Sequence, residues 1–193
     1  MKINGIIKYL IAFDFTVLTA SGLIAPIFAI FIANNIVGGS VAIAGFASSI
    51  YMVSFSAARL ISAYNVDKRL NERQRVALSI LGTILVGASY FLYLAAKLPW
   101  HVYLLQVLNG IGTAFRYSPF TSLFTRHIDK GQESFEWGIN AVATSLGQAL
   151  TAAIGGMLAE RYGFNAIFIV SGIFVLIGSF IPIMVCKEFL KRF

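Results

Sequence analysis

The chain has 193 residues, of which 58% are hydrophobic and only 12% are charged. Soluble domains carry about 25% charged residues, so this composition excludes an ordinary soluble domain. The net charge of +7 does not indicate nucleic-acid binding, because the basic residues lie between apolar runs rather than along one face. The sequence therefore predicts an all-α membrane protein whose first partner is the lipid bilayer.

Apolar runs of transmembrane length follow one another along the whole chain. A membrane-spanning helix needs about 20 predominantly apolar residues, and six runs approach that length. Short connections between the runs make neighbouring spans antiparallel. The fold predicted for residues 1–193 is therefore a single domain of six transmembrane helices. The predicted spans are residues 6–33, 41–64, 76–96, 100–125, 137–159 and 164–185.

Lysine and arginine are distributed unequally between the two sides that these spans define. One side carries the basic residues of both termini and of the loops after the second and fourth spans, whereas the other carries only Lys97 and Arg161. Because cytoplasmic loops are enriched in Lys and Arg, both termini are predicted to be cytoplasmic. The basic residues on that side are Lys2, Lys8, Lys68, Arg69, Arg73, Arg75, Arg126, Lys130, Lys187, Lys191 and Arg192.

The fifth predicted span combines a thin edge of small residues with a polar edge. Close approach over small residues associates helices in lipid, so its glycines are expected at helix contacts. Asn140 and Gln148 lie at helical spacing and are predicted to line a cavity, since polar groups at membrane depth face protein or water. Hydrogen bonding between helices is the alternative role for both. The glycines are Gly138, Gly147, Gly155 and Gly156.

Asp14, Arg59 and Arg116 lie farther inside the predicted spans than Lys8, and an ionisable group within a span indicates function. Asp14 is about 9 Å deep at 1.5 Å per residue, which suits a proton or cation site or an ion-pair partner for an arginine. Arg116 is the deepest base and shares a helical face with Gln106 and Asn109, which favours contact with an anionic solute or a pair with Asp14. Arg59 lies nearer the cytoplasm, so a gating or structural role is favoured.

Acidic and basic residues recur together in two loops on opposite faces. Asp67, Arg73 and Arg75 follow the second span and are predicted to form a charge clasp that holds one conformational state. A solvated loop that sets topology is the alternative. Glu160 and Arg161 place an acid before a base again after the fifth span, and this recurrence three spans later favours an inverted three-plus-three repeat.

Metal, cofactor and enzyme chemistry are not expected from this sequence. His101 and His127 are far apart, there is one cysteine, and no carboxylate has metal-ligand spacing. A phosphate-binding glycine loop followed by Lys-Ser/Thr is also missing, so no nucleotide-driven motor is predicted.

Four motifs resemble those of the major facilitator superfamily of secondary transporters. The fifth-span glycines follow the family's pattern, with Thr151 and Ala152 where the family has Gly-Pro. The loops around Asp67 and Glu160 are similar to its charged signature. In the fourth span, the segment from Gln106 to Gly112 resembles R-x-x-Q-G-x-G, with glutamine in place of the arginine. Family members usually have twelve spans in two halves, so the resemblance implies one six-span half in a bacterial-type inner membrane.

The resemblance implies a transporter that needs a second half. Two copies would insert in the same orientation and relate by a two-fold axis along the membrane normal. The leading hypothesis is a homodimeric secondary transporter that moves a small solute, coupled to a proton or cation. Alternatives are a non-transporting membrane interaction module and one half of a heterodimer. A passive channel is disfavoured, because no ring of repeated charges or filter sequence is present.

Overall fold

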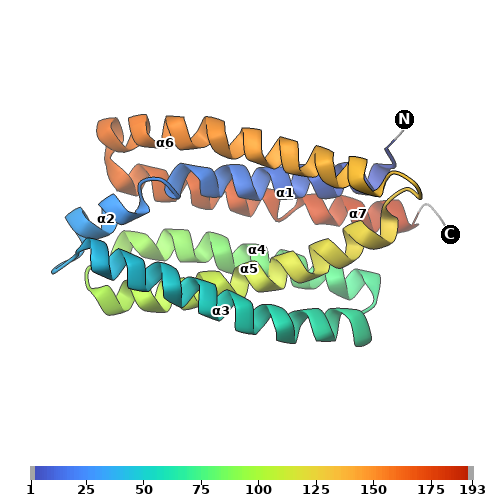
Figure 1. The fold of residues 1–193 in the computed structure, drawn as a ribbon, viewed down its shortest axis with the longest axis horizontal. Coiled ribbons are helices and arrows are strands. Elements are labelled where there is room, and N and C mark those ends of the chain that lie inside the picture. Colours follow the sequence, from blue (N-terminus) through green and yellow to red (C-terminus); the bar gives the residue numbers. More distant parts are fainter. Residues whose placement is uncertain (1–2, 191–193) are drawn as a thin grey trace.

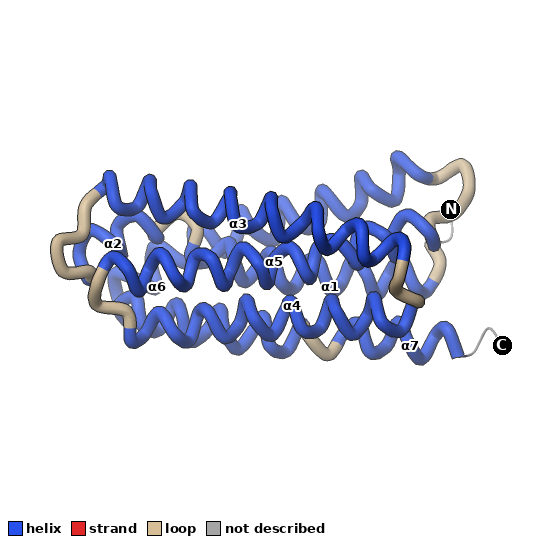
Figure 2. Tube along the Cα trace, turned by 90° about the horizontal axis from the view of Figure 1, so that it is seen from below, coloured by secondary structure: helices blue, strands red, loops and turns tan. Residues whose placement is uncertain are grey.

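The computed structural model describes residues 3–190, and every regular element in that range is a helix. The helices run lengthwise in one elongated bundle (Figure 1), and the chain reverses at its two ends (Figure 2). Lys2, Lys191 and Arg192, which entered the topology argument, lie outside the described residues. The elements are α1 (Gly5–Ile24), α2 (Phe28–Asn35), α3 (Val41–Lys68), α4 (Glu72–Leu92), the 3-10 turn η1 (Tyr93–Ala95), α5 (Pro99–His127), α6 (Glu133–Gly178) and α7 (Ile181–Leu190).

The first predicted span is two helices rather than one. The sequence predicts a continuous helix over residues 6–33, but α1 ends at Ile24 and α2 begins at Phe28. The interruption contains Pro26, which has no backbone N–H to donate and whose ring clashes with the carbonyl four residues earlier. The break therefore follows directly from the proline, and it tilts α2 away from the line of α1 (Figure 1).

Polar side chains fix where several helices begin. Asn4 accepts a hydrogen bond from a first-turn N–H of α1 at 3.0 Å, and Ser40 does the same for α3 at 3.2 Å. Asn71 and Gln74 form a reciprocal capping box at the start of α4. Pro99 occupies the first turn of α5, where a missing N–H does no harm. These residues are local signals that the sequence alone displays.

The long helical stretch α6 reverses direction at Gly163, whose φ of 79° and ψ of 169° are not helical. A positive φ of this kind favours glycine, because the Cβ of any other residue would clash with the adjacent backbone. Both arms pack on α1: Gly155 lies against Leu23, and Gly178 lies against Thr16. Figure 1 shows the arms as neighbouring helices that run back on each other.

Four helical stretches within residues 3–190 are long and apolar enough to cross a membrane. The last of them contains both arms of α6. Helix α5 is not among the four, because residues such as Gln106, Asn109 and Arg116 lower its hydropathy. The stretches are Gly5–Ile24, Val41–Lys68, Glu72–Ala95 and Glu133–Cys186.

The basic loops gather at one end of the bundle. The start of α1, the turn between α3 and α4, the loop between α5 and α6 and the end of α7 lie together (Figure 1). The α3–α4 turn carries Lys68, Arg69 and Arg73, and the α5–α6 loop carries Lys130. The connection from α2 to α3 and the corner at Gly163 lie at the opposite end.

The glycines of α6 separate into two groups. A Cβ on Gly147 would overlap the Thr19 side chain, and one on Gly155 would overlap the backbone of α1. In contrast, apart from the adjoining residues and the nearby backbone of α6 itself, no atom of the described residues lies within 4 Å of a Cβ built on Gly138 or Gly156. The expectation of a helix contact is therefore not met at these two positions within one chain. Gly138 is nine residues from Gly147, which is half a turn out of phase on a helix.

Alanine substitutions at the adjacent glycines of α6 should separate packing from helix propensity. Gly155→Ala should destabilise the bundle by about 1–3 kcal/mol, because overpacking forces the helices apart. Gly156→Ala should be neutral or stabilising by up to about 1 kcal/mol, since alanine is the better helix former. Unfolding of both variants in detergent measures the difference. Equal losses at the two positions would contradict the described packing of α6 on α1.

Candidate functional site

A buried ion pair joins the first and the fifth helices near the middle of the bundle. Nη1 of Arg116 on α5 donates to Oδ1 of Asp14 on α1 at 2.6 Å. Each side chain is only 3% exposed. A buried pair is retained at a high desolvation cost, and removing one partner leaves an uncompensated charge. The two residues singled out from the sequence are therefore direct partners in this state.

Helix α6 completes the coordination of the carboxylate. The side-chain amide of Asn140 donates to Oδ2 of Asp14 at 3.0 Å, so both carboxylate oxygens have donors. The hydroxyl of Thr144 donates to the Asn140 backbone carbonyl at 2.8 Å. Oδ1 of Asn140 is buried and has no partner among the described residues. Asp14 thus links α1 to α5 through the charged donor Arg116 and to α6 through the neutral donor Asn140.

Close packing of α4 holds Arg116 in place. A Cβ on Gly82 would overlap the backbone of α5 at Arg116, so only glycine permits this approach. The hydroxyl of Ser79 donates to the Arg116 carbonyl at 3.4 Å. The guanidinium also lies 5.8 Å from the ring centroid of Phe13 and 5.9 Å from that of Tyr117. The aromatic rings exclude water from the pair, which strengthens its electrostatic attraction.

Gln106 and Asn109 lie beyond the ion pair, about 10–15 Å along α5 at 1.5 Å per residue. Both line a cavity of about 280 Å³, and neither Asp14 nor Arg116 contributes to its wall. Gln106 is buried, and Oδ1 of Asn109 accepts from the hydroxyl of Thr113 at 3.2 Å. The structure therefore separates the predicted polar face of α5 into a charged pair and an uncharged cavity wall.

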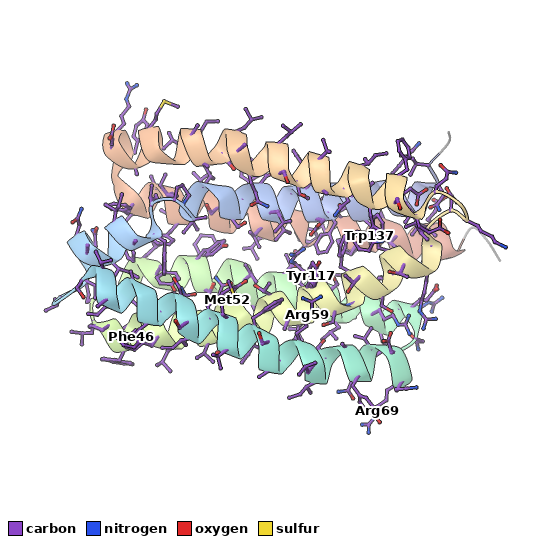
Figure 3. The ribbon with its side chains drawn as sticks, in the orientation of Figure 1. Phe46, Met52, Arg59, Arg69, Tyr117 and Trp137 are labelled. Carbon is purple, nitrogen blue, oxygen red and sulfur yellow. The ribbon has the colours of Figure 1, made fainter. Side chains whose placement is uncertain are left out.

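Arg59 is exposed on α3 and lies against aromatic rings of α3 and α5. Its guanidinium carbon is 4.5 Å from the Tyr117 ring centroid and 5.5 Å from that of Phe55 (Figure 3). Exposed cation–π contacts of this kind contribute about 0.5–1 kcal/mol. Arg59 thus lies near the ring of Tyr117, as Arg116 does.

The predicted charge clasp is bridged by a hydroxyl. Nη1 of Arg75 donates to Oγ of Ser122 at 3.1 Å, and Ser122 in turn donates to Oδ1 of Asp67 at 3.3 Å. Nε of Arg75 donates to the carbonyl of Leu70 at 3.1 Å. Arg73 is exposed and lies outside this chain of hydrogen bonds. The contacts join α3, α4 and α5 at the end of the bundle that carries the basic loops.

The other candidate residues lie apart from the ion pair. Gln148 is half-buried on α6 and does not line the cavity of Gln106 and Asn109. Glu160 and Arg161 are exposed at the corner before Gly163. Within residues 3–190, no group of three or more His, Cys, Asp and Glu side chains is placed to hold a metal ion.

Glu136 is a buried carboxyl group that the sequence analysis did not single out. Its side chain is fully buried, and Oε2 accepts the N–H of Asp129 at 3.2 Å. Asn4 donates to Oδ1 of Asp129 at 3.2 Å and to the carbonyl of His127 at 2.6 Å. These contacts tie the start of α1 to the α5–α6 loop. The available signal was position: Glu136 precedes Asn140 by four residues, on the same helical face.

The sequence of the chain matches the family described as Major Facilitator Superfamily over residues 11–190. That range includes the ion pair, the cavity wall and both charged loops. Together with the long apolar helices, the match identifies an integral membrane protein.

Similar proteins include transporters of bacteria and humans. The multi-drug resistance efflux pump PmrA of Streptococcus pneumoniae is 26% identical over 168 residues, which cover 86% of this chain and 41% of the pump. The human voltage-gated purine nucleotide uniporter SLC17A9 is 30% identical over 67 residues, which cover 35% of this chain and 15% of the uniporter. The chain thus spans less than half the length of the pump that it matches.

Removing the buried arginine should be far more harmful than removing the exposed one. Arg116→Met should destabilise the protein by about 3–5 kcal/mol, because it leaves the Asp14 carboxylate buried and unpaired. The same change at exposed Arg59 should cost about 1 kcal/mol or less. Denaturant unfolding in detergent measures both variants.

The double variant Asp14→Asn with Arg116→Met should recover most of that loss, since neither charge then remains buried. Equal effects of Arg116→Met and Arg59→Met, or no recovery in the double variant, would contradict a buried and mutually dependent pair.

Proposed function

The chain belongs to the major facilitator superfamily, and from this membership we propose that it is a six-span half of a secondary transporter. Two copies form a homodimer that moves a small solute across the membrane by alternating access. The solute binds near the middle of the membrane, where the two copies face each other. The family match and the resemblance to transporters support the transport of a solute rather than a chemical conversion.

The observation that most supports a second half is that polar side chains of helix α3 are exposed. Only 11% of the residues in the most apolar 18-residue window of α3 are buried, whereas 50% are buried in the corresponding windows of Gly5–Ile24 and Glu72–Ala95. Ser49, Ser56 and Arg59 are exposed on α3, and Ser56 lies about 18 Å from the helix end at Lys68. Polar groups at membrane depth face protein or a water-filled cavity. A second half supplies a protein surface against α3 and a water-filled cavity between the halves.

A second copy of the same chain is the simplest partner. Basic loops at one end of the bundle favour a cytoplasmic position for both termini, so two copies insert in the same orientation. The chain covers 41% of the pump it resembles, close to the size of one half. A two-fold axis along the membrane normal then brings the exposed α3 face of each copy against its partner.

The proposed six spans comprise α5 and two crossings within the Glu133–Cys186 stretch, in addition to the other three candidate stretches. The break at Gly163 supports two crossings in that stretch, and the packing of α5 against both α3 and α4 supports a crossing at α5. Asp67 lies at the end of the second of the first three crossings, and Glu160 lies at the end of the second of the last three, at the opposite end of the bundle. This correspondence supports an inverted three-plus-three repeat.

Asp14 is the coupling group and Arg116 its counter-ion. When a proton or cation binds the carboxylate, the attraction to Arg116 weakens and the contact between α1 and α5 loosens. The Asn140 amide still donates to the neutral acid, so α6 keeps its hold on α1. The bridge from Arg75 through Ser122 to Asp67 joins three helices at the cytoplasmic end, where opening and closing require its contacts to change.

Vesicles that contain only this chain test the proposal. Under a proton gradient, they should take up at least one solute from a panel of labelled neutral, anionic and cationic small molecules, with saturation. Asp14→Asn should reduce the gradient-driven uptake by about 5- to 150-fold, the usual range of coupling between two sites. Gly156→Ala, which lies away from helix contacts, is the matched control and should transport normally.

A non-transporting interaction module makes the opposite prediction. Folded, dimeric protein in vesicles would then take up no solute of the panel, and Asp14→Asn would change nothing. That result would overturn the transporter proposal.

A further inference from the structure

A cavity of about 280 Å³ lies among α1, α2, α3, α4, η1 and α5, in the half of the bundle that faces away from the basic loops. We call it the tyrosine pocket, because tyrosines from three different elements line it together with two side-chain amides. Its size approaches the lower end of the range of small-molecule sites. The residues that define it are Tyr51, Met52, Tyr90, Tyr93, Gln106 and Asn109.

The pocket has an exposed mouth and a buried floor. Met52, on α3, is 60% exposed, whereas Tyr93 is 3% and Gln106 is 8% exposed. Figure 3 shows Met52 on the length of α3 between Phe46 and Arg59. The mouth therefore opens on the α3 face that the second copy covers, and the floor is formed within a single chain.

The floor holds a polar group without a protein partner. The hydroxyl of Tyr93 is buried and accepts or donates no hydrogen bond within the described residues. Its ring is fixed by stacking on Phe168, with centroids 5.0 Å apart, and by an edge contact with Phe28 at 5.6 Å. A buried hydroxyl that lacks a partner loses its hydration without compensation. A ligand in the pocket would restore the missing hydrogen bond.

The lining carries no charge. Its polar groups are amides and hydroxyls, and the remaining walls are aromatic rings and aliphatic groups. Arg116, seven residues from Asn109 on α5, is already neutralised by Asp14 at 2.6 Å. Arg59, seven residues from Met52 on α3, is not part of the lining, and its guanidinium lies 4.5 Å from the Tyr117 ring centroid. An anion or cation in the pocket would therefore be desolvated without a counter-ion, at a cost of several kcal/mol. A neutral solute loses only hydration that the amides and hydroxyls replace.

We propose that each chain carries its own binding site, the tyrosine pocket, for an uncharged, flat aromatic solute with amide-like donors and acceptors. Aromatic walls contact the solute's ring, and Gln106, Asn109 and the Tyr93 hydroxyl bind its polar groups. This inference rests on the proposed transport function and deepens it: it names the solute class, and it places the solute in a pocket within each chain instead of in one site shared between the copies. It replaces the sequence-based expectation of an anionic solute held by Arg116.

Three probes of one shape test the charge preference: benzamide, benzoate and benzylammonium. With the purified chain in detergent, calorimetry or ligand-observed NMR should show saturable binding of benzamide. Both charged probes should bind at least about tenfold more weakly, since each would be buried without a counter-ion. Equal or tighter binding of benzoate, or no binding of benzamide, would overturn the proposal.

Tyr93→Phe removes only the unpartnered hydroxyl. Benzamide affinity should fall about 2- to 13-fold, the equivalent of one net hydrogen bond. The unfolding temperature should not fall, because no protein hydrogen bond is lost. Tyr103→Phe is the matched control: this half-buried tyrosine of α5 does not line the pocket, so both quantities should stay unchanged. Unchanged benzamide affinity in Tyr93→Phe would overturn the assignment of the hydroxyl.

The binding test separates the solute class from the transport function. Benzamide binding by a chain that transports nothing in vesicles would keep the pocket and refute the transporter. Transport without benzamide binding would refute the pocket's assignment alone.

Discussion

The ion pair between Asp14 and Arg116 is the interaction on which the rest of the structure depends. It joins residues 102 positions apart in the chain. Asn140, 126 positions from Asp14, connects a third helix to the pair. Neither charge is tolerated alone inside the bundle, so the helices α1, α5 and α6 are held in one arrangement as long as both are present. The glycine contacts on α4 and α6 provide the close approach that this geometry needs.

The same pair determines what the interior can recognise. The carboxylate neutralises the guanidinium, so Arg116 offers no free charge, and the cavity farther along α5 is lined by amides, hydroxyls and rings. In the transporter that we propose, one chain supplies both the coupling group, Asp14, and an uncharged binding wall. In the same proposal, the exposed polar face of α3 packs against the second half.

Much of the helical pattern could be predicted from the sequence, because apolar runs, prolines, caps and basic loops are local signals. Pairings between distant residues could not, since they depend on how helices pack. The positions of Asp14 and Arg116 within apolar runs indicated charges inside the membrane, but they did not show whether the two side chains contact each other. It gave no reason to separate Gly155, which packs on α1, from Gly156, which does not. Glu136 was missed because it lies one residue before the predicted start of the fifth span at residue 137.

The central claim is that two copies of this chain assemble into one transporter. Native mass measurement of the chain, released from lipid nanodiscs or a mild detergent, tests it most directly. The account predicts a stable species with the mass of two chains, retained after dilution and independent of the detergent chosen. A chain that remains monomeric in every lipid and detergent would contradict it, because the polar face of α3 would then have no partner copy.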